Sequence, residues 1–480
     1  MGLAGILLAL GLLVFLSYRG WTILLLAPGA ALLAAALSGE PLLAHWTQTF
    51  MGGGAQFLAQ FFPLFLLGAL FGKLMEDSGS VEAIARFMTD RLGAGRAMLA
   101  VVLAGAIVTY GGVSLFVAIF VIAPMAHGVF KRADIPVRLM PAAIALGTMT
   151  FTMSALPGTP ALQNAIPMPF FGTTPFAAPG LGIVAAAIML TFGMWWLGRA
   201  ERLARRQGEG YGQAPQSPAE APGLRERATI ASEFDPAELP HGRHAAEVPA
   251  VWVALLPLVV VILVNLAMSV LVLPRLDTSF LAEERFGSTT LAAVGGVWSV
   301  AVALFAALVT LIVLNYRRLP SLKESVDAGA NASVLPALSV ASLVGFGAVI
   351  AALPAFALVR DFVLSIEGGP LVSLAVSTNI LAALTGSAAG GLTIALDALG
   401  ETYLQLAGEQ GIDPALLHRI AVMSAGTLDS LPHNGAVVTL LSVCGVTHRE
   451  SYFDLLMVAI VGALIALAVA IALGSAMGSF

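Results

Sequence analysis

The sequence predicts an all-α polytopic membrane protein made of two inverted-topology repeats. Of its 480 residues, 58% are hydrophobic and only 11% are charged, whereas a soluble domain carries roughly 25% charged residues. The charged residues are clustered, which leaves many uncharged stretches of about 18 to 25 residues, the length that spans a bilayer. This composition excludes a soluble enzyme, a nucleic-acid-binding protein and a secreted disulfide scaffold. The single cysteine, Cys444, allows no intrachain disulfide.

The uncharged stretches define the expected membrane segments. They cover residues 3–17, 21–38, 56–74, 98–126, 137–165, 181–198, 250–273, 290–315, 335–358, 370–399, 417–446 and 453–477. Two of them, 98–126 and 370–399, are too long for one ordinary span, and each has a polar, glycine-rich centre.

The distribution of Lys and Arg predicts the orientation, because short cytoplasmic loops are enriched in these residues. The charged linker 199–249 begins with four arginines directly after a span, so we expect it in the cytoplasm. Its part 207–222 is low in apolar residues and is expected to be disordered. The flanks of 98–126 then both lie inside and those of 370–399 both lie outside, which makes each segment a re-entrant hairpin. Both chain termini are expected on the outer side.

Equivalent features recur at one offset, as duplicated halves predict. Thr109 and Thr385 open the two glycine-rich tips and are 276 positions apart, and Pro157 and Pro432 follow in Leu-Pro breaks that are 275 apart. We therefore expect an N-terminal repeat at 1–198 and a C-terminal repeat at 250–480, each with five spans and one hairpin. Inverted repeats with broken helices are typical of secondary transporters, whose binding site lies near the bilayer midplane.

Four polar segments lie where hydrocarbon would surround them: 109–114, 152–160, 385–391 and 424–435. Non-helical backbone at that depth is tolerated only where protein or a water-filled cavity covers it, and the N-termini of half-helices attract anions. The expected substrate-binding residues are Thr109, Tyr110, Gly111, Gly112, Ser114, Ser154, Gly158, Thr159, Thr385, Gly386, Ser387, Gly390, His433 and Asn434.

Each of these assignments has a structural alternative. The glycines also suit close helix packing, the hydroxyls of Thr152 and Ser424 also bond back to their own helix, and Tyr110 also suits a purely lining role. Asn164, Asn265 and Asn379 are expected to make interhelical hydrogen bonds.

Asp429 is the most informative single residue, because an intramembrane carboxylate is costly and is functional by default. We expect Asp429 to take up and release the driving proton, helped by His433, which follows four positions later across Pro432. The alternative is that both residues only cap the helix break.

The sequence lacks a Walker A loop, a His-Glu-x-x-His motif, a dinucleotide fingerprint and a metal-ligand cluster. We therefore expect no cofactor, no metal, no ATP-driven pump and no enzymatic activity.

These segments resemble the gluconate permease family of the ion transporter superfamily. The matching motifs cover residues 68–75 (Gly-Ala-Leu-Phe-Gly-Lys-Leu-Met), 109–114 (Thr-Tyr-Gly-Gly-Val-Ser), 156–160 (Leu-Pro-Gly-Thr-Pro) and 430–435 (Ser-Leu-Pro-His-Asn-Gly). The resemblance implies import of a small organic acid anion, driven by protons, by a homodimer in the bacterial inner membrane. It also implies a scaffold domain that supports a moving transport domain, an elevator-like mechanism. Residues 161–167 and 385–391 are more similar to the 3-hydroxybutyrate branch than to the sugar-acid branch.

The leading hypothesis is proton symport of a short hydroxy-monocarboxylate such as 3-hydroxybutyrate, or of a gluconate-like sugar acid. The nearest rival is a sodium-coupled carboxylate symporter, because sodium binds at similar hairpin tips in the superfamily. A passive anion channel is a further alternative, and a membrane-embedded enzyme is disfavoured.

Overall fold

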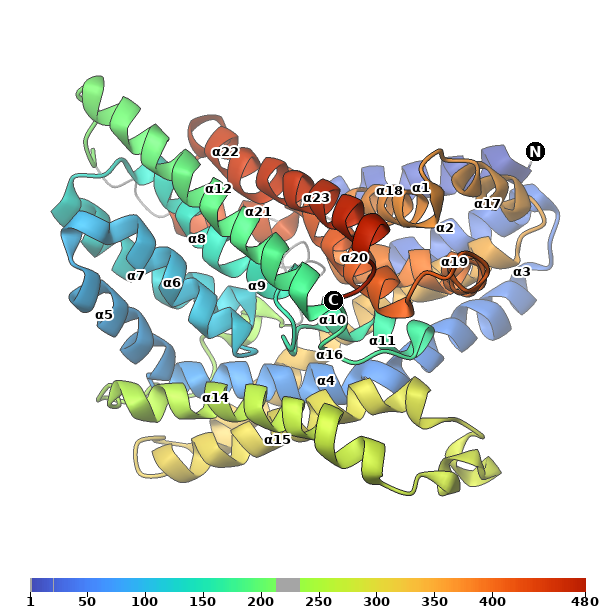
Figure 1. The fold of residues 1–480 in the computed structure, drawn as a ribbon, viewed down its shortest axis with the longest axis horizontal. Helices are drawn as coiled ribbons and strands as arrows, with labels where there is room; N and C mark the ends of the chain where they lie inside the picture. The colour runs from blue at the N-terminus through green and yellow to red at the C-terminus, as the bar shows by residue number, and fades with distance from the viewer. Residues whose placement is uncertain (1, 20, 213–233) are drawn as a thin grey trace.

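The computed structural model describes residues 2–19, 21–212 and 234–480 (Figure 1). These residues form helices and loops and contain no strand, which confirms the predicted all-α class. Among them, seven helices are long and apolar enough to cross a membrane, and four further apolar helices are shorter. The protein is therefore a multi-pass membrane protein.

The first half of the chain contains two hydrophobic helices, one very long helix, a helical hairpin and a helix broken into short pieces. Its helices are α1 (Gly2–Tyr18), α2 (Ile23–Ser38), α3 (Leu42–Ala44), α4 (Met51–Asp77), α5 (Ser80–Leu92), α6 (Ala97–Tyr110), α7 (Leu115–Ala133), α8 (Met140–Thr148), α9 (Phe151–Ser154), α10 (Leu162–Ala165), α11 (Pro167–Phe171) and α12 (Pro179–Arg206).

The second half repeats this order of elements. Its helices are α14 (Val251–Ala267), α15 (Leu291–Asn315), α16 (Leu322–Ala352), α17 (Phe356–Leu364), α18 (Gly369–Thr385), α19 (Ala388–Gln410), α20 (Pro414–Thr427), α21 (Gly435–Val443), α22 (His448–Leu456) and α23 (Gly462–Met477). A long helix, a short helix, a hairpin, a broken helix and a final long helix thus occur twice. The opposite orientation of the two halves in the bilayer stays a prediction.

Several helices are longer than the charge pattern predicts. The hairpin expected at 98–126 continues to Ala133, the hairpin expected at 370–399 continues to Gln410, and the span expected at 56–74 belongs to one helical rod over 42–77. The linker expected at 199–249 begins as helix, since α12 continues to Arg206. An uncharged stretch marks only the apolar part of a helix. Ion pairs such as that between Glu201 and Arg205 stabilise the continuation of α12 into the polar region.

Helices α4 and α16 pack along one another, and α14 and α15 lie beside them (Figure 1). Glycines permit the close approach of α4 and α16. A Cβ atom at Gly54 would lie 3.0 Å from the carbonyl oxygen of Ala341, and one at Gly345 would lie 2.6 Å from that of Phe50. Small residues at membrane-helix contacts allow backbones to approach in this way. Helices α12 and α23 form a second pair on the other side of the molecule (Figure 1).

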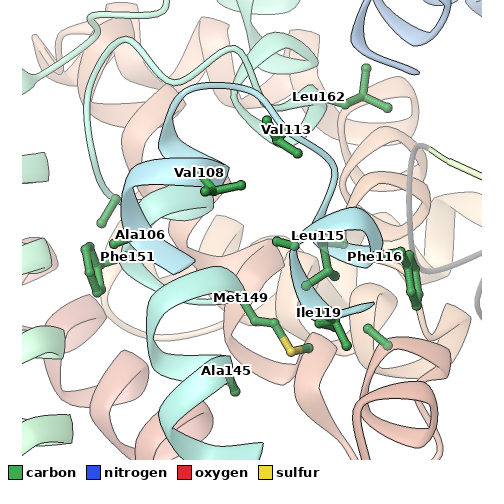
Figure 2. Packing of buried hydrophobic residues seen from close by; sticks show 14 of the residues in the cluster. Ala106, Val108, Val113, Leu115, Phe116, Ile119, Ala145, Met149, Phe151 and Leu162 are labelled. Atoms are coloured by element: carbon green, nitrogen blue, oxygen red, sulfur yellow. The ribbon is translucent and has the colours of Figure 1, made fainter. Parts of the chain in front are cut away.

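The two hairpins lie at opposite ends of the view, α6 and α7 on the left and α18 and α19 on the right (Figure 1). Hairpin 1, formed by α6 and α7, packs on α8, where a Cβ at Gly147 would lie 2.3 Å from the carbonyl oxygen of Val102. Figure 2 shows Val108, Val113 and Leu115 around its tip, with Met149 and Phe151 beside them. Buried apolar side chains therefore hold the tip in place.

The described ends of the linker attach to different helices. On the N-terminal side, Arg138 forms an ion pair with Glu209 at 2.8 Å, and Asp134 accepts a hydrogen bond from the backbone N–H of Tyr211 at 2.9 Å. On the C-terminal side, Asp235 donates its backbone N–H to Ala332 on α16, and Lys73 on α4 donates to the carbonyl oxygen of Leu239 at 2.8 Å. Of the part 207–222 that is expected to be disordered, residues 207–212 have the defined contacts just given, and residues 213–222 fall outside the described residues.

We expect Gly345→Ala to lower the thermal stability of the purified protein, because its methyl group collides with backbone that cannot rotate away. The loss is of the order of 1–3 kcal/mol, as for other overpacked positions. The measurement is the unfolding midpoint in detergent. Gly52→Ala on α4 is the matched control, since nothing lies within 4 Å of its added Cβ. Equal midpoints for the two variants would contradict the close-packing interpretation.

Candidate functional site

The tip of hairpin 1 begins where α6 ends at Tyr110. Gly112 has a φ of 97°, which an L side chain rarely adopts, and Ser114 caps α7 by accepting the backbone N–H of Phe116 at 3.4 Å. The hydroxyl of Thr109 donates to the carbonyl oxygen of Gly105 at 2.8 Å and lies 3.1 Å from the hydroxyl of Thr152. The predicted tip residues therefore lie together, and the Thr109 hydroxyl is held by protein groups.

The first helix break follows α9 and faces this tip. The Tyr110 hydroxyl donates to the carbonyl oxygen of Pro157 at 2.8 Å, which ties the tip to the break. Gly158 has a φ of 79° and its carbonyl oxygen accepts a hydrogen bond from Asn265 at 3.0 Å. Asn265 thus joins α14 to the break, whereas the sequence predicts a bond from this amide to another helix. Ser154 donates instead within its own turn, to the carbonyl oxygen of Thr150 at 3.1 Å.

A cavity of about 30 Å³ lies between the tip and the break. It has room for a water molecule, and its lining includes Thr109, Gly112, Ser114, Met153 and Gln163. Gln163 is 8% exposed, and within the described chain its Oε1 atom has no hydrogen-bond partner. Gln163 is not among the expected binding residues, although an amide in an apolar break segment is a signal of the same kind as Asn164.

Hairpin 2, formed by α18 and α19, has an equivalent tip. Thr385 is the last residue of α18, Gly386 has a φ of 65°, and Ser387 caps α19 by accepting the backbone N–H of Gly390 at 3.1 Å. The Thr385 hydroxyl donates to the carbonyl oxygen of Leu381 at 2.8 Å. Gly390 has the packing role, since a Cβ there would lie 2.7 Å from the side chain of Leu343.

The second helix break brings Asp429 to this tip. Asp429 lies in a 3-10 turn after α20, and its carboxylate accepts hydrogen bonds from the side-chain amide of Asn434 at 2.7 Å and from the backbone N–H of Ala388. The same amide nitrogen of Asn434 donates to the carbonyl oxygen of Gly386 at 2.9 Å. One amide group therefore joins the carboxylate to the tip of hairpin 2.

His433 contacts α18 of hairpin 2. Its Nε2 atom lies 3.1 Å from the carbonyl oxygen of Ala383 on α18, and because a carbonyl only accepts, this nitrogen is the donor. Pro432 turns the chain after Asp429, so that Asn434 supplies the side-chain hydrogen bond to the carboxylate. His433 and Asn434 therefore both contact hairpin 2, and the expected role of His433 in proton uptake stays a prediction.

The two broken helices contact each other directly. A Cβ at Gly426 on α20 would lie 2.9 Å from the Cβ of Ser154 on α9. Asn164 makes a second connection, because it donates to the carbonyl oxygens of Thr159 and Pro175, both at 3.0 Å, while its Oδ1 accepts from His418 and Arg419 on α20. Thr159 and Gly158 therefore belong to the same network as α20.

His418 and Arg419 are site residues that the sequence analysis missed. Both side chains are fully buried. A basic pair near the start of a predicted span is typical of an interfacial position, where long side chains reach the headgroups. No local signal therefore indicates that this pair lies inside the protein.

Two further expectations have separate outcomes. Ser424 donates to the carbonyl oxygen of Ile420 at 2.6 Å, the back-bonding alternative. Asn379 donates to Ala375 on its own helix at 2.8 Å, so the predicted interhelical bond is wrong for this amide. The described residues contain no group of three or more His, Cys, Asp or Glu side chains that could hold a metal ion.

Comparison with solved structures finds the same fold in another transporter. The YdaH transporter of Alcanivorax borkumensis, whose crystal structure is described as having an unusual topology, aligns with a TM-score of 0.55 at 16% sequence identity. The alignment covers 91% of this chain and 89% of that chain. At this identity the likeness establishes the fold alone.

Comparison with curated sequences gives closer relatives, although no family profile matches the chain. The uncharacterized transporter YxjC of Bacillus subtilis is 42% identical over 463 residues, which are 95% of each protein. The high-affinity gluconate transporter of Escherichia coli K12 is 34% identical over 143 residues, 28% of this chain and 31% of that protein. With the motifs at both tips and both breaks, these relatives confirm the resemblance seen in the sequence: the chain belongs to the gluconate permease family of membrane transporters.

Proposed function

We propose that this chain is a secondary active transporter of the bacterial inner membrane that imports a small organic acid anion together with a proton. The observation that carries the proposal is the position of Asp429, a half-buried carboxylate that joins a broken helix to the tip of a hairpin. A carboxylate at such a depth is costly when charged, and binding a proton removes the cost. Asp429 is therefore the residue that binds the driving proton.

The substrate carboxylate occupies the space between the two tips and the two breaks. Helices α7, α19 and α21 all begin at these points, with Ser114, Ser387 and Asn434 as their capping residues. Backbone N–H groups at helix N-termini favour an anion. Thr109 and Thr385 orient the tips through hydrogen bonds to backbone carbonyl oxygens, and Gln163 lines the small cavity together with Thr109 and Ser114.

Short hydroxy-monocarboxylates such as 3-hydroxybutyrate fit this site better than a polyol chain, because few polar side chains line it. Gluconate-like sugar acids are the second substrate class, in line with the gluconate transporter among the relatives. A long sugar acid buries several hydroxyl groups, each of which needs a hydrogen-bond partner.

The transport step is an elevator-like movement within each subunit of a homodimer. The paired helices α4 and α16, with α14 and α15, form a scaffold, and the hairpins and broken helices form the moving body. The packing supports this division, since each hairpin tip is tied by hydrogen bonds to a broken helix.

Sodium coupling is the rival hypothesis, and the second tip offers little to a sodium ion. The carbonyl oxygens of Ala383 and Gly386 are the natural ligands at this tip, but they accept hydrogen bonds from His433 and Asn434. A sodium ion at these oxygens would compete with both hydrogen-bond donors. A proton requires only the Asp429 carboxylate.

We expect Asp429→Asn to abolish accumulation driven by a pH gradient and to leave exchange of bound substrate in place. The amide keeps the size of the carboxylate but carries no proton between the two sides. Uptake and counterflow of labelled 3-hydroxybutyrate or gluconate in proteoliposomes measure the two activities. Asp361→Asn on the exposed helix α17 is the control and retains accumulation. Concentrative uptake by the Asp429→Asn variant would remove Asp429 from the mechanism.

Separate ion gradients distinguish the rival hypotheses. We expect an inward proton gradient to drive accumulation in sodium-free buffer, and a sodium gradient at equal pH to drive none. The same vesicles test for a passive channel, because a carrier gives saturable uptake and counterflow. Uptake that requires sodium would overturn the proton assignment, and linear uptake without counterflow would overturn secondary transport.

The effect of candidate substrates on the thermal stability of the protein tests the substrate class. A ligand that binds only the folded protein raises the unfolding midpoint, and at 100 times its Kd it adds about 2.7 kcal/mol. We expect 3-hydroxybutyrate to raise the midpoint more than gluconate at equal concentration, with neutral 1,3-butanediol as the control. A larger shift with gluconate would assign the site to sugar acids.

A further inference from the structure

Arg419 is a fully buried cation without a carboxylate partner among the residues that the structure describes. Its Nε and Nη2 atoms donate to the carbonyl oxygen of Ala177, at 3.1 and 2.7 Å, and its Nη1 atom lies 3.4 Å from Oδ1 of Asn164. All of these acceptors are neutral. Lys73, the other fully buried cation in the described ranges, has both Glu76 and Asp77 within 3.2 Å.

The polar groups around Arg419 are neutral and are engaged in hydrogen bonds, so none of them compensates its charge. Oδ1 of Asn164 already accepts from His418, and the nitrogen of the same amide donates to two carbonyl oxygens. His418 is satisfied as a neutral imidazole, because Nε2 donates to Asn164 and Nδ1 accepts from the Thr173 hydroxyl at 2.6 Å. A buried charge without a counter-ion is strongly unfavourable.

The charge of Arg419 lies directly behind the substrate region. A Cβ at Gly182 would lie 2.4 Å from the carbonyl oxygen of Ala155 and 3.3 Å from Nε of Arg419, so the guanidinium is beside the end of α9. In a medium of low polarity such a charge acts over several ångströms.

Asp429 is the second isolated charge of the same broken helix. It lies ten residues after Arg419, roughly 15 Å along a helical path, and its carboxylate accepts hydrogen bonds from the Asn434 amide and the Ala388 N–H. The two charges are therefore too far apart to form an ion pair, but they sum to zero.

We propose that Arg419 is the fixed positive charge that balances the substrate carboxylate. The binding site of the moving body then carries no net charge, whether it is loaded or empty. This inference rests on the proposed function. In the empty protein, Arg419 (+1) and ionised Asp429 (−1) cancel. In the loaded protein, Arg419 cancels the substrate monoanion, and Asp429 is neutral because it carries the proton. One proton therefore accompanies each monoanion, and dianions are excluded.

The wild-type protein provides the first test. Proteoliposomes with a fixed pH gradient are set to different membrane potentials with potassium and valinomycin, and uptake of labelled 3-hydroxybutyrate and gluconate is followed. We expect the initial rate to be independent of potential and the proton-to-substrate flux ratio to be one. A rate that follows the potential, or a different ratio, overturns the proposal.

Arg419→Gln provides the second test. Its loaded form carries a net negative charge, so we expect KM for the monoanion to rise about tenfold or more and an inside-negative potential to slow uptake. Arg419→Lys restores the charge and is expected to return uptake to independence from potential. Arg360→Gln on the exposed helix α17 is the control. A purely structural role of Arg419 would lower the amount of active protein without making uptake sensitive to potential.

The outcomes separate this inference from the proposed function. If no carboxylate is taken up under a pH gradient, both fail. If pH-driven uptake occurs but moves charge, only the charge-balance proposal fails. If Arg419→Gln does not fold, the wild-type flux ratio and the behaviour of Arg419→Lys still decide the question.

Discussion

The structure depends on hydrogen bonds to the backbone N–H and C=O groups that the helix breaks leave free. Inside a membrane, water cannot make these bonds. Two carboxamide side chains contribute at both breaks. Asn164 donates to two carbonyl oxygens of the segment around the first break, and Asn434 holds both the tip of hairpin 2 and the carboxylate of the second break. The loops can lie deep in the protein because these amides replace water, and a polar site in the middle of an apolar protein is the result.

The sequence predicted the parts of the fold that follow from local chemistry. Proline and glycine place the breaks at Leu156-Pro157 and Leu431-Pro432, since neither residue continues a helix well, and the glycines at 112 and 386 take the positive φ values that end the hairpin helices. Asp429 was found because a lone carboxylate in an apolar segment stands out. The relatives confirm the family that these motifs indicated.

Other features depend on contacts between distant residues and leave no local signal. Arg419 looks like an interfacial residue until the segment around Ala177 covers it. The hydrogen bond from Asn434 to Asp429 has no local signal, because the sequence does not set the directions of the side chains that follow the break at Pro432. The helix over 42–77 contains a run of three glycines that argues against a helix locally, yet two of these glycines make the contact with α16.

The attachment of the linker at both of its described ends has a mechanical consequence. Residues 209–211 are fastened beside hairpin 1, and residues 235–245 are fastened to α4 and α16. Any displacement of hairpin 1 relative to α4 and α16 therefore has to carry residues 209–211 away from residues 235–245, or break the contacts that fasten one of these two ends.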